Sequence, residues 1–536
     1  MKKLYILILA AALVAAACQQ EDQLRLEQLQ QELSELNASE KGLPEAVTPA
    51  SPSEQGVFGF VFDRDRYGVD AAGSVTVSYT LPEAATVEVS AKDGWSAVLN
   101  ADGAGGTIVV TAPDPASPSD VVVTATTEDG RHTAAILPVM VRDPYTEATR
   151  TDVAALAYYC LTPSLSTDYH FKMLADGGFN MLTIEQVDNW QEQLTLAHKY
   201  GLKGVLFVNG VAGRYYLSHG TDTEIDAVIN EAKTYPALAA YQIFDEPSTI
   251  NIGQITFEKN RIEELDPDHP VYVNLHPASA SKNSLGVDDY FEYVETFVTE
   301  CNLKFITFDQ YPVFVDGIDR SWPRSLEAVS RSAKKHGIPF WAFTLCCREY
   351  IREDPNLENI RLQNNTNLLY GAQVNQFFVY RSTSGTDYAP LQTWEYRPDG
   401  SRDFNVVKYT AAYDACKAYN TEMHNRGYIF YLCDVQKVCN NNVLDGWNEN
   451  LKQDDLQPHI QSLATSDAAL ISFIGNKGNK YIAVLNSNWK ATNTVAVHFN
   501  DMVYSIDHDG VFTEHAGGSD ATFAVEPGDM IVFKVE

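Results

Sequence analysis

Carboxylic acids occur in this 536-residue chain at positions where they could carry out acid–base chemistry. Glu246 follows Asp245 and precedes Pro247 at the end of a hydrophobic run, and Asp309 ends a second run. Glu349 lies shortly after a third run. Two carboxyl groups can cleave a glycosidic bond, because one protonates the leaving oxygen while the other attacks the anomeric carbon or activates water. The chain therefore carries candidates for both roles.

Polar and aromatic side chains end or flank the other hydrophobic runs. Aromatic faces stack on sugar rings, and amide and guanidinium groups bind hydroxyl groups. Packing in the protein core is the alternative role for each of the aromatic side chains. The candidates for stacking on a sugar are Tyr311, Trp341 and Tyr380. Position alone marks five further candidates for substrate binding, Glu185, Asn209, Asn274, His276 and Arg381.

The elements that must position these side chains are short apolar runs that alternate with amphipathic segments. The runs cover residues 154–160, 181–185, 204–209, 239–244, 271–275, 305–308, 340–345 and 374–380. Eight strand–helix units in about 270 residues predict a (β/α)8 TIM barrel, with residues 409–425 as its closing helix. An open doubly wound sheet would need a glycine-rich phosphate loop after the first strand, and none is present. In a barrel, the carboxyl ends of the strands meet at one rim, so the candidates should converge there.

Period-two patterns on both sides of the barrel predict all-β domains. Strands such as Thr107–Thr111 and Val121–Thr126 indicate an N-terminal sandwich, in which Trp95 is either core or a sugar platform. The predicted boundaries are 1–17 for a signal peptide, 18–55 for a stalk and linker, 56–145 for the N-terminal sandwich, 146–427 for the barrel and 428–536 for a C-terminal sandwich.

The N-terminus has the order of a lipoprotein signal. Lys2 and Lys3 precede an apolar run that is too short for a permanent membrane span, and three alanines precede Cys18. This order resembles the bacterial lipobox, which implies cleavage before Cys18 and a lipid on its thiol. An ordinary secretory peptide with a chance cysteine is the alternative. Residues 19–22 resemble the acidic tag of Bacteroidetes surface lipoproteins, so we expect a lipid-anchored protein of the outer membrane, exposed at the cell surface.

The segment that follows Cys18 predicts a short helix. Leucines at positions 26, 29, 33 and 36 form a heptad seam, which indicates weak self-association through residues 24–37 or, alternatively, a polar stalk. Residues 38–55 are rich in Ser, Pro, Ala and Glu, a composition typical of a linker.

Composition limits the partners of the chain. The net charge of −32 repels nucleic acid and anionic lipid and suits a neutral ligand. The spacing of the eight cysteines matches no metal site, although Cys433 and Cys439 could pair. The motifs of zinc proteases, serine hydrolases and nucleotide-binding loops are absent from the sequence, so we expect neither a metal nor an organic cofactor.

Several motifs in the barrel segment occur together in a known group. The tripeptide 245–247 resembles the Asn-Glu-Pro of retaining clan A glycoside hydrolases, whose Glu is the general acid/base. More closely, the chain is similar to glycoside-hydrolase-like barrels of Bacteroidetes, which follow BACON-like or Ig-like modules. That resemblance rests on Tyr241…Asp245-Glu246-Pro247, Asp309-Gln310-Tyr311-Pro312, Pro339-Phe340-Trp341 and Ile360-Arg361-Leu362…Leu369-Tyr370-Gly371-Ala372-Gln373.

Two departures from the clan matter for the chemistry. Asp245 replaces the clan's Asn, and the seventh strand ends without the nucleophilic carboxylate, since no acid occurs before Glu349. The resemblance therefore implies Glu246 as acid/base with Asp309 as its partner, and with Glu349 and Asp245 in reserve.

These observations predict a surface-anchored glycoside hydrolase of a glycan-utilisation system, with a carbohydrate as its substrate. The missing strand-seven carboxylate leaves an alternative open, which is a non-catalytic glycan-binding lipoprotein on a decayed barrel. A purely structural adhesin is the third candidate function.

Overall fold

The structure of this protein is a computed structural model. It describes residues 59–63, 67–69, 72–92, 94–113, 121–137, 139–141, 152–162, 165–185, 189–208, 222–349, 352–381, 390–396, 402–442, 444 and 446–535. Cys18, the leucine seam at 24–37 and the linker at 38–55 lie outside these residues, so the lipid anchor and the self-association remain predictions.

Eight parallel strands close into a barrel in chain order, with β19 pairing back onto β10. This confirms the predicted (β/α)8 fold. The first strand ends at Ala157 rather than at Cys160, because Tyr159 takes a left-handed conformation (φ 46°) that does not continue a strand. The strands are β10 (Ala154–Ala157), β11 (Met181–Ile184), β12 (Lys203–Phe207), β13 (Leu238–Asp245), β14 (Val271–Leu275), β15 (Ile306–Phe308), β18 (Phe340–Leu345) and β19 (Val374–Phe378).

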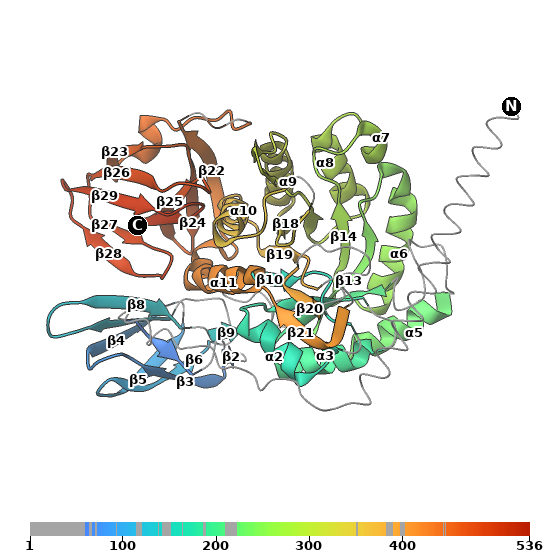
Figure 1. The fold of residues 1–536 in the computed structure, drawn as a ribbon, viewed down its shortest axis with the longest axis horizontal. Coiled ribbons are helices and arrows are strands. Elements are labelled where there is room, and N and C mark those ends of the chain that lie inside the picture. Colours follow the sequence, from blue (N-terminus) through green and yellow to red (C-terminus); the bar gives the residue numbers. More distant parts are fainter. Residues whose placement is uncertain are drawn as a thin grey trace, which may run out of the picture. The chain divides into compact units, whose positions relative to one another are not determined.

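A helix follows each barrel strand and covers the outside of the barrel (Figure 1). Helix α9 (Trp322–His336) shows why the sequence folds this way, since a proline stands in its first turn and Gly337 ends it with a left-handed conformation. Short elements also occur in the loops, namely α7 (Lys282–Leu285), β16 (Val313–Phe314) and β17 (Gly317–Ile318). The eight helices are α2 (Asp168–Asp176), α3 (Trp190–Lys199), α5 (Asp222–Ala232), α6 (Ile252–Leu265), α8 (Tyr290–Glu300), α9 (Trp322–His336), α10 (Leu357–Leu369) and α11 (Ala411–Phe430).

Helix α10 is buried on two opposite faces, which explains its many buried amides. On the barrel side, Thr344 donates a hydrogen bond to Asn364 (2.7 Å). On the other side, the Asn365 amide donates to the carbonyl of Gly528 in the C-terminal sandwich (3.0 Å). Since neither face meets water, every polar group on α10 needs a partner within the protein.

The C-terminal part of the chain forms two sheets around one core. The cluster that holds the sheets together includes Ile471, Val484, Val497 and Phe533. One sheet has the order β22 (Asp434–Asn441), β24 (Ala469–Asn476), β25 (Asn479–Asn486), β30 (Met530–Lys534), β27 (Val503–Ile506) and β28 (Phe512–His515). The other has the order β23 (Ile460–Thr465), β26 (Asn493–Phe499) and β29 (Asp520–Val525).

The suggested pairing of Cys433 with Cys439 is wrong. Both thiols are free, and the extended strand β22 separates the two residues by roughly 18–20 Å. A disulfide would require α-carbons within about 7 Å of each other.

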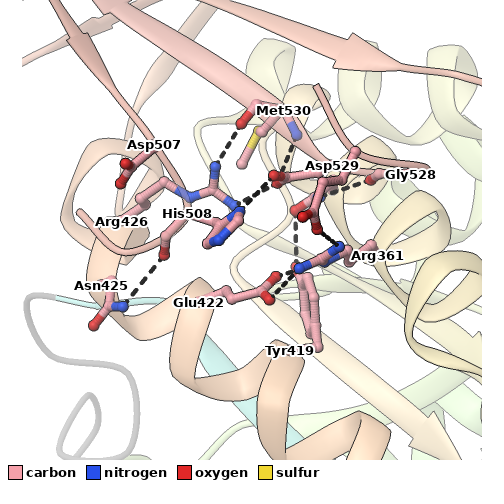
Figure 2. A network of polar contacts seen from close by, with 12 residues as sticks. Arg361, Tyr419, Glu422, Asn425, Arg426, Asp507, His508, Gly528, Asp529 and Met530 are labelled. Carbon is pink, nitrogen blue, oxygen red and sulfur yellow. Dashed lines mark hydrogen bonds and ion pairs between the residues drawn. The ribbon is translucent and has the colours of Figure 1, made fainter. Parts of the chain in front are cut away.

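Buried charges join the barrel to the C-terminal sandwich, and Figure 2 shows this network. The guanidinium of Arg426, whose side chain is 1% exposed, lies 3.3 Å from the Asp529 carboxylate and also donates to the carbonyl of Met530 (2.7 Å). His508 lies 2.7 Å from the other oxygen of Asp529. The two domains therefore share charges that neither domain could bury alone.

The charges of this network shift the pKa of its members in opposite directions. Burial alone would raise the pKa of Asp529, but Arg426 and His508 outweigh it and lower the pKa to about 2. The hydrogen bond to Asp529 raises the pKa of His508 to about 9, against the effect of burial. Both groups are therefore charged at neutral pH.

The N-terminal part of the described chain is a β-sandwich whose two sheets share one core. Trp95 is 6% exposed and belongs to that core, so its role is packing rather than sugar stacking. The sheets are β1 (Val61–Phe62), β3 (Ser74–Thr80), β6 (Gly105–Thr111) and β5 (Ser96–Asp102), and β4 (Thr86–Ala91), β7 (Val121–Thr126) and β8 (His132–Ile136), with β2 (Tyr67–Val69) parallel to β9 (Val139–Val141).

A separate compact unit contains the antiparallel hairpin of β20 (Gln392–Tyr396) and β21 (Arg402–Tyr409). Within the described ranges, no helix is both long and apolar enough to cross a bilayer.

Candidate active site

The ends of three neighbouring barrel strands bring five of the predicted residues together. Strand β13 ends at Asp245, and the next residue, Glu246, takes a left-handed conformation with φ of 46°. The amide of Glu246 donates to the carbonyl of Asn274 at the end of β14 (2.9 Å). A strained conformation at a non-glycine residue is costly, and such residues cluster at functional sites. The turn places the Glu246 side chain at the rim, where it is 43% exposed.

His276 holds the Glu246 carboxylate from the next strand end. Its Nδ1 lies 3.3 Å from Oε1 of Glu246, and its own side chain is only 15% exposed. Tyr293 of α8 holds the backbone at His276 and at Pro247, the residue after Glu246. Its hydroxyl accepts a hydrogen bond from the His276 amide (3.2 Å) and donates one to the carbonyl of Pro247 (2.6 Å). The position of the carboxylate is thus set by contacts from two elements.

A buried chain of hydrogen bonds supports the carboxyl group of Asp245. The Asn274 amide donates to Oδ1 of Asp245 (2.9 Å), and its own oxygen accepts from Thr307 (3.2 Å). Gln376 on β19 in turn donates to the Thr307 hydroxyl (2.7 Å). All three supporting residues are at most 1% exposed. Burial and the charge of Glu246 raise the pKa of Asp245, which outweighs the opposing bond from Asn274.

Asp309 at the end of β15 lies next to Glu246, and the interaction of the two carboxyl groups lowers the pKa of Glu246. Burial raises the pKa of Asp309 well above its usual value, and the charges of Glu246 and Asp245 raise it further. In contrast, the hydrogen bond from His276 lowers the pKa of the more exposed Glu246, and the bond with Asp309 lowers it as well. Burial therefore favours the proton on Asp309, and the contact with His276 favours the charge on Glu246.

The contact between the two carboxyl groups also bears on their chemistry. Retaining glycosidases hold these groups roughly 5–5.5 Å apart, and inverting ones roughly 6.5–9.5 Å apart with a water molecule between them. Carboxyl groups in direct contact lie closer together than either range, so the Glu246–Asp309 pair in this structure matches neither arrangement.

Aromatic side chains form a cluster next to the carboxyl pair. Tyr311 stacks on Phe378 with ring centroids 5.3 Å apart, and Phe378 also lies 5.8 Å from Tyr159. Like Phe207, these rings are only partly buried. Only Tyr311 was predicted. The others could have been found from the sequence, because each lies at or just beyond the end of a barrel strand.

Glu185 and Arg381 are brought together, but as an ion pair. Their side chains lie 3.0 Å apart and are 10% and 13% exposed. Glu185 also accepts hydrogen bonds from the amide of Cys160 (3.1 Å) and the hydroxyl of Thr183 (2.7 Å). Because these contacts use both carboxylate oxygens, the pair links the ends of β10, β11 and β19, and its role in substrate binding remains a prediction.

Two predicted substrate platforms are corrected by their burial. Trp341 stands near the start of β18, inside the barrel, and stacks on Phe305 with centroids 4.3 Å apart. It is 8% exposed, so no sugar ring can reach its face. Tyr380 is fully buried and packs edge-on against Phe179. Asn209 lies outside the described residues, and its binding role remains a prediction.

Other reactive groups lie outside the carboxyl pair. Glu349 faces Arg352 at 3.9 Å in the segment after β18. Cys346 and Cys347 are buried thiols whose pKa burial raises, which disfavours the thiolate needed for a nucleophile. Among the described side chains, no group of three or more His, Cys, Asp and Glu is arranged to hold a metal ion.

Comparisons with known proteins give no family. No protein-family model matches the chain, and no curated protein matches it. Among solved structures, a β-glucuronidase from Ruminococcus gnavus in complex with D-glucaro 1,5-lactone is 12% identical, with 67% of each chain covered and a TM-score of 0.35.

Two further solved structures have similar values. An FMN-binding β-glucuronidase from Facaelibacterium prausnitzii L2-6 is 11% identical over 87% of this chain and 70% of that one, with a TM-score of 0.34. A β-galactosidase from the psychrophilic Marinomonas ef1 is 11% identical over 50% of this chain and 59% of that one, with a TM-score of 0.36. These neighbours are glycoside hydrolases, but values this low assign neither a family nor an activity.

The like charge of Asp245 leads to a prediction about pH dependence. Any reaction in which Asp309 must give up a proton fails as the pH rises through the pKa of that group, and kcat/KM reports this pKa in the free protein. Because the Asp245 charge raises the pKa of Asp309, we expect Asp245→Asn to move the alkaline limb of kcat/KM to lower pH. Asp288→Asn, a change at an exposed carboxylate, is the control. An alkaline limb that stays in place would contradict the assignment of the proton to Asp309.

Proposed function

We propose that this protein is a glycoside hydrolase in which Glu246 and Asp309 form the catalytic carboxyl pair. The observation that carries the proposal is a pair of interacting carboxyl groups at the strand ends of the barrel, of which Asp309 has a raised pKa and Glu246 a lowered one. Partly exposed aromatic rings beside the pair, such as Tyr311 and Phe378, offer faces on which a sugar ring can stack.

The electrostatics of the pair suggest how the roles are divided. Asp309 donates its proton to the glycosidic oxygen of the bound sugar. The bond between that oxygen and the anomeric carbon then breaks. The ionised Glu246 attacks the anomeric carbon, and water later releases the sugar while Asp309 recovers a proton. This division reverses the one implied by the clan A resemblance, in which Glu246 is the general acid/base.

The wider setting of this activity rests on the sequence alone. A lipid on Cys18 and the acidic residues after it would hold the enzyme at the outer surface of the outer membrane, as part of a glycan-utilisation system. A net charge of −32 suits neutral glycans better than acidic ones.

The experiment that tests the proposal is a hydrolysis screen of the soluble form, residues 19–536, against plant, host and microbial glycans. We expect release of reducing sugar from at least one neutral glycan. Glycan binding without any release of sugar would favour the alternative of a non-catalytic binding protein on the same barrel, and would overturn the proposed activity.

A further inference from the structure

A guanidinium group lies at the rim of the barrel beyond the carboxyl pair. Arg352 stands in the segment after β18 and pairs with Phe314 of the β16–β17 hairpin in an isolated β-bridge. Its guanidinium carbon lies 3.8 Å from the centroid of the Phe314 ring, and the side chain is 21% exposed. Stacking of this kind holds a cation in a fixed place and orientation.

The charge of Arg352 is only loosely compensated by the protein. The nearest carboxylate, Glu349, lies 3.9 Å from its Nε, which is too far for a hydrogen bond. Nη1 of Arg352 and Oε2 of Glu349 are both buried, and neither has a hydrogen-bond partner. A donor and an acceptor thus stand side by side, both withdrawn from water and both unsatisfied, which is unusual in a folded protein.

This pair of groups is a neighbour of the carboxyl pair. Tyr311 stands between them in the chain, two residues after Asp309 and three before Phe314, on which Arg352 stacks. After burial, the charges of Asp309 and Glu349 both raise the pKa of its hydroxyl. A sugar chain bound at Glu246 and Asp309 could therefore continue across Tyr311.

The local charges indicate which chemistry would fit. Glu349 lies 3.9 Å from Arg352, and the charge of Asp319 also acts on the pKa of Arg352, so one positive charge meets two negative ones, a net charge of −1. Glu353 lies 3.6 Å from Lys490, so its charge is compensated separately. An acidic ligand would add a further negative charge, whereas a hydroxyl pair can accept from Arg352 and donate to Glu349 at once.

We propose that Arg352 and Glu349 form a second sugar-binding subsite, which takes a neutral sugar unit through two adjacent hydroxyl groups. The inference rests on the proposed glycan substrate but not on hydrolysis. It deepens the proposed function by naming the substrate class, which is an uncharged oligosaccharide of several units.

The test measures binding without turnover, so that its failure is distinguishable from a failure of the proposed activity. In a Glu246→Gln background, calorimetry would follow binding of neutral hexasaccharides (cello-, xylo-, manno- and laminari-) and of a galacturonate hexasaccharide. We expect a neutral hexasaccharide to bind, and Arg352→Ala to weaken it by about tenfold or more, as for lost hydrogen bonds to a charged group. Hydrolysis is measured separately with the unchanged protein.

Matched variants separate this role from a structural one. Arg348→Ala removes an exposed arginine that binds Asp354 on the same segment. The affinity of this variant for the hexasaccharide should equal that of its parent. Arg352→Lys keeps a cation over Phe314 but loses the second donor, so it should fold and still bind weakly. Equal affinity in the Arg352 variants and their parent, failure of every neutral hexasaccharide to bind, or tighter binding of the galacturonate hexasaccharide would each overturn the proposal.

Discussion

Glu246→Gln should lower kcat by about 10³-fold or more on any glycan that the protein hydrolyses, while binding of that glycan persists. Glutamine has the same shape and can keep the contacts with His276 and Asp309, which lie within hydrogen-bond reach of Glu246. The change removes the negative charge, and without it the side chain can neither attack nor stabilise the anomeric carbon. Initial rates of sugar release and a separate binding measurement would check both parts.

The matched control for this variant is Glu192→Gln, a change of the same type at an exposed residue of α3. We expect its kcat to equal that of the unchanged protein. A Glu246→Gln variant that retained full activity would remove Glu246 from the chemistry, and with it the proposed pair.

Asp529→Asn should be the most destabilising single change in the interface of the barrel and the C-terminal sandwich. It leaves the guanidinium of Arg426, 1% exposed, buried without its carboxylate (Figure 2). Removing one partner of a buried ion pair typically costs about 3–5 kcal/mol, because the remaining charge is uncompensated. Urea unfolding followed by fluorescence would measure the loss in the free energy of unfolding.

A neighbouring aspartate provides the control for that measurement. Asp509 lies 3.7 Å from His508 but is 56% exposed, and Asp509→Asn should cost less than about 1 kcal/mol. A cost this small for Asp529→Asn as well would show that the network does not join the two domains.

The pKa values of His508 and Asp529 also determine how the stability of this interface depends on pH. The raised pKa of His508, about 9, means that its contribution is complete below the unfolded value near 6.5 and is lost as the pH rises through 9. The lowered pKa of Asp529, about 2, means that its contribution is complete above about 4 and is lost as the pH falls through 2. Stabilisation by the network is therefore greatest between about pH 4 and 6.5.

The sequence predicted the barrel and much of the site because both depend on local patterns. Apolar runs mark the strands, and the rule that barrel strands end at the catalytic rim selected Glu246, Asp309, Asn274 and His276 together. Trp341 stands near the start of its apolar run, which is also visible in the sequence. The same rule would therefore have placed Trp341 away from the rim.

Other features could not be predicted because they depend on contacts between distant segments. The left-handed turn at Glu246 lets its carboxylate meet Asp309, and no residue type signals that turn. The burial of α10 on two faces arises from the C-terminal sandwich, which begins far along the chain. The ion pair of Glu185 and Arg381 likewise joins residues almost 200 positions apart.

The most direct test of the carboxyl pair compares two leaving groups in the Asp309→Asn variant. A glycosidic oxygen in a natural glycan needs a proton to leave, whereas dinitrophenolate leaves without one. We expect Asp309→Asn to lose about 10²–10⁴-fold in kcat/KM on the natural glycan but less than about tenfold on a dinitrophenyl glycoside of the same sugar. An equal loss on both substrates, or no loss on either, would contradict Asp309 as the proton donor.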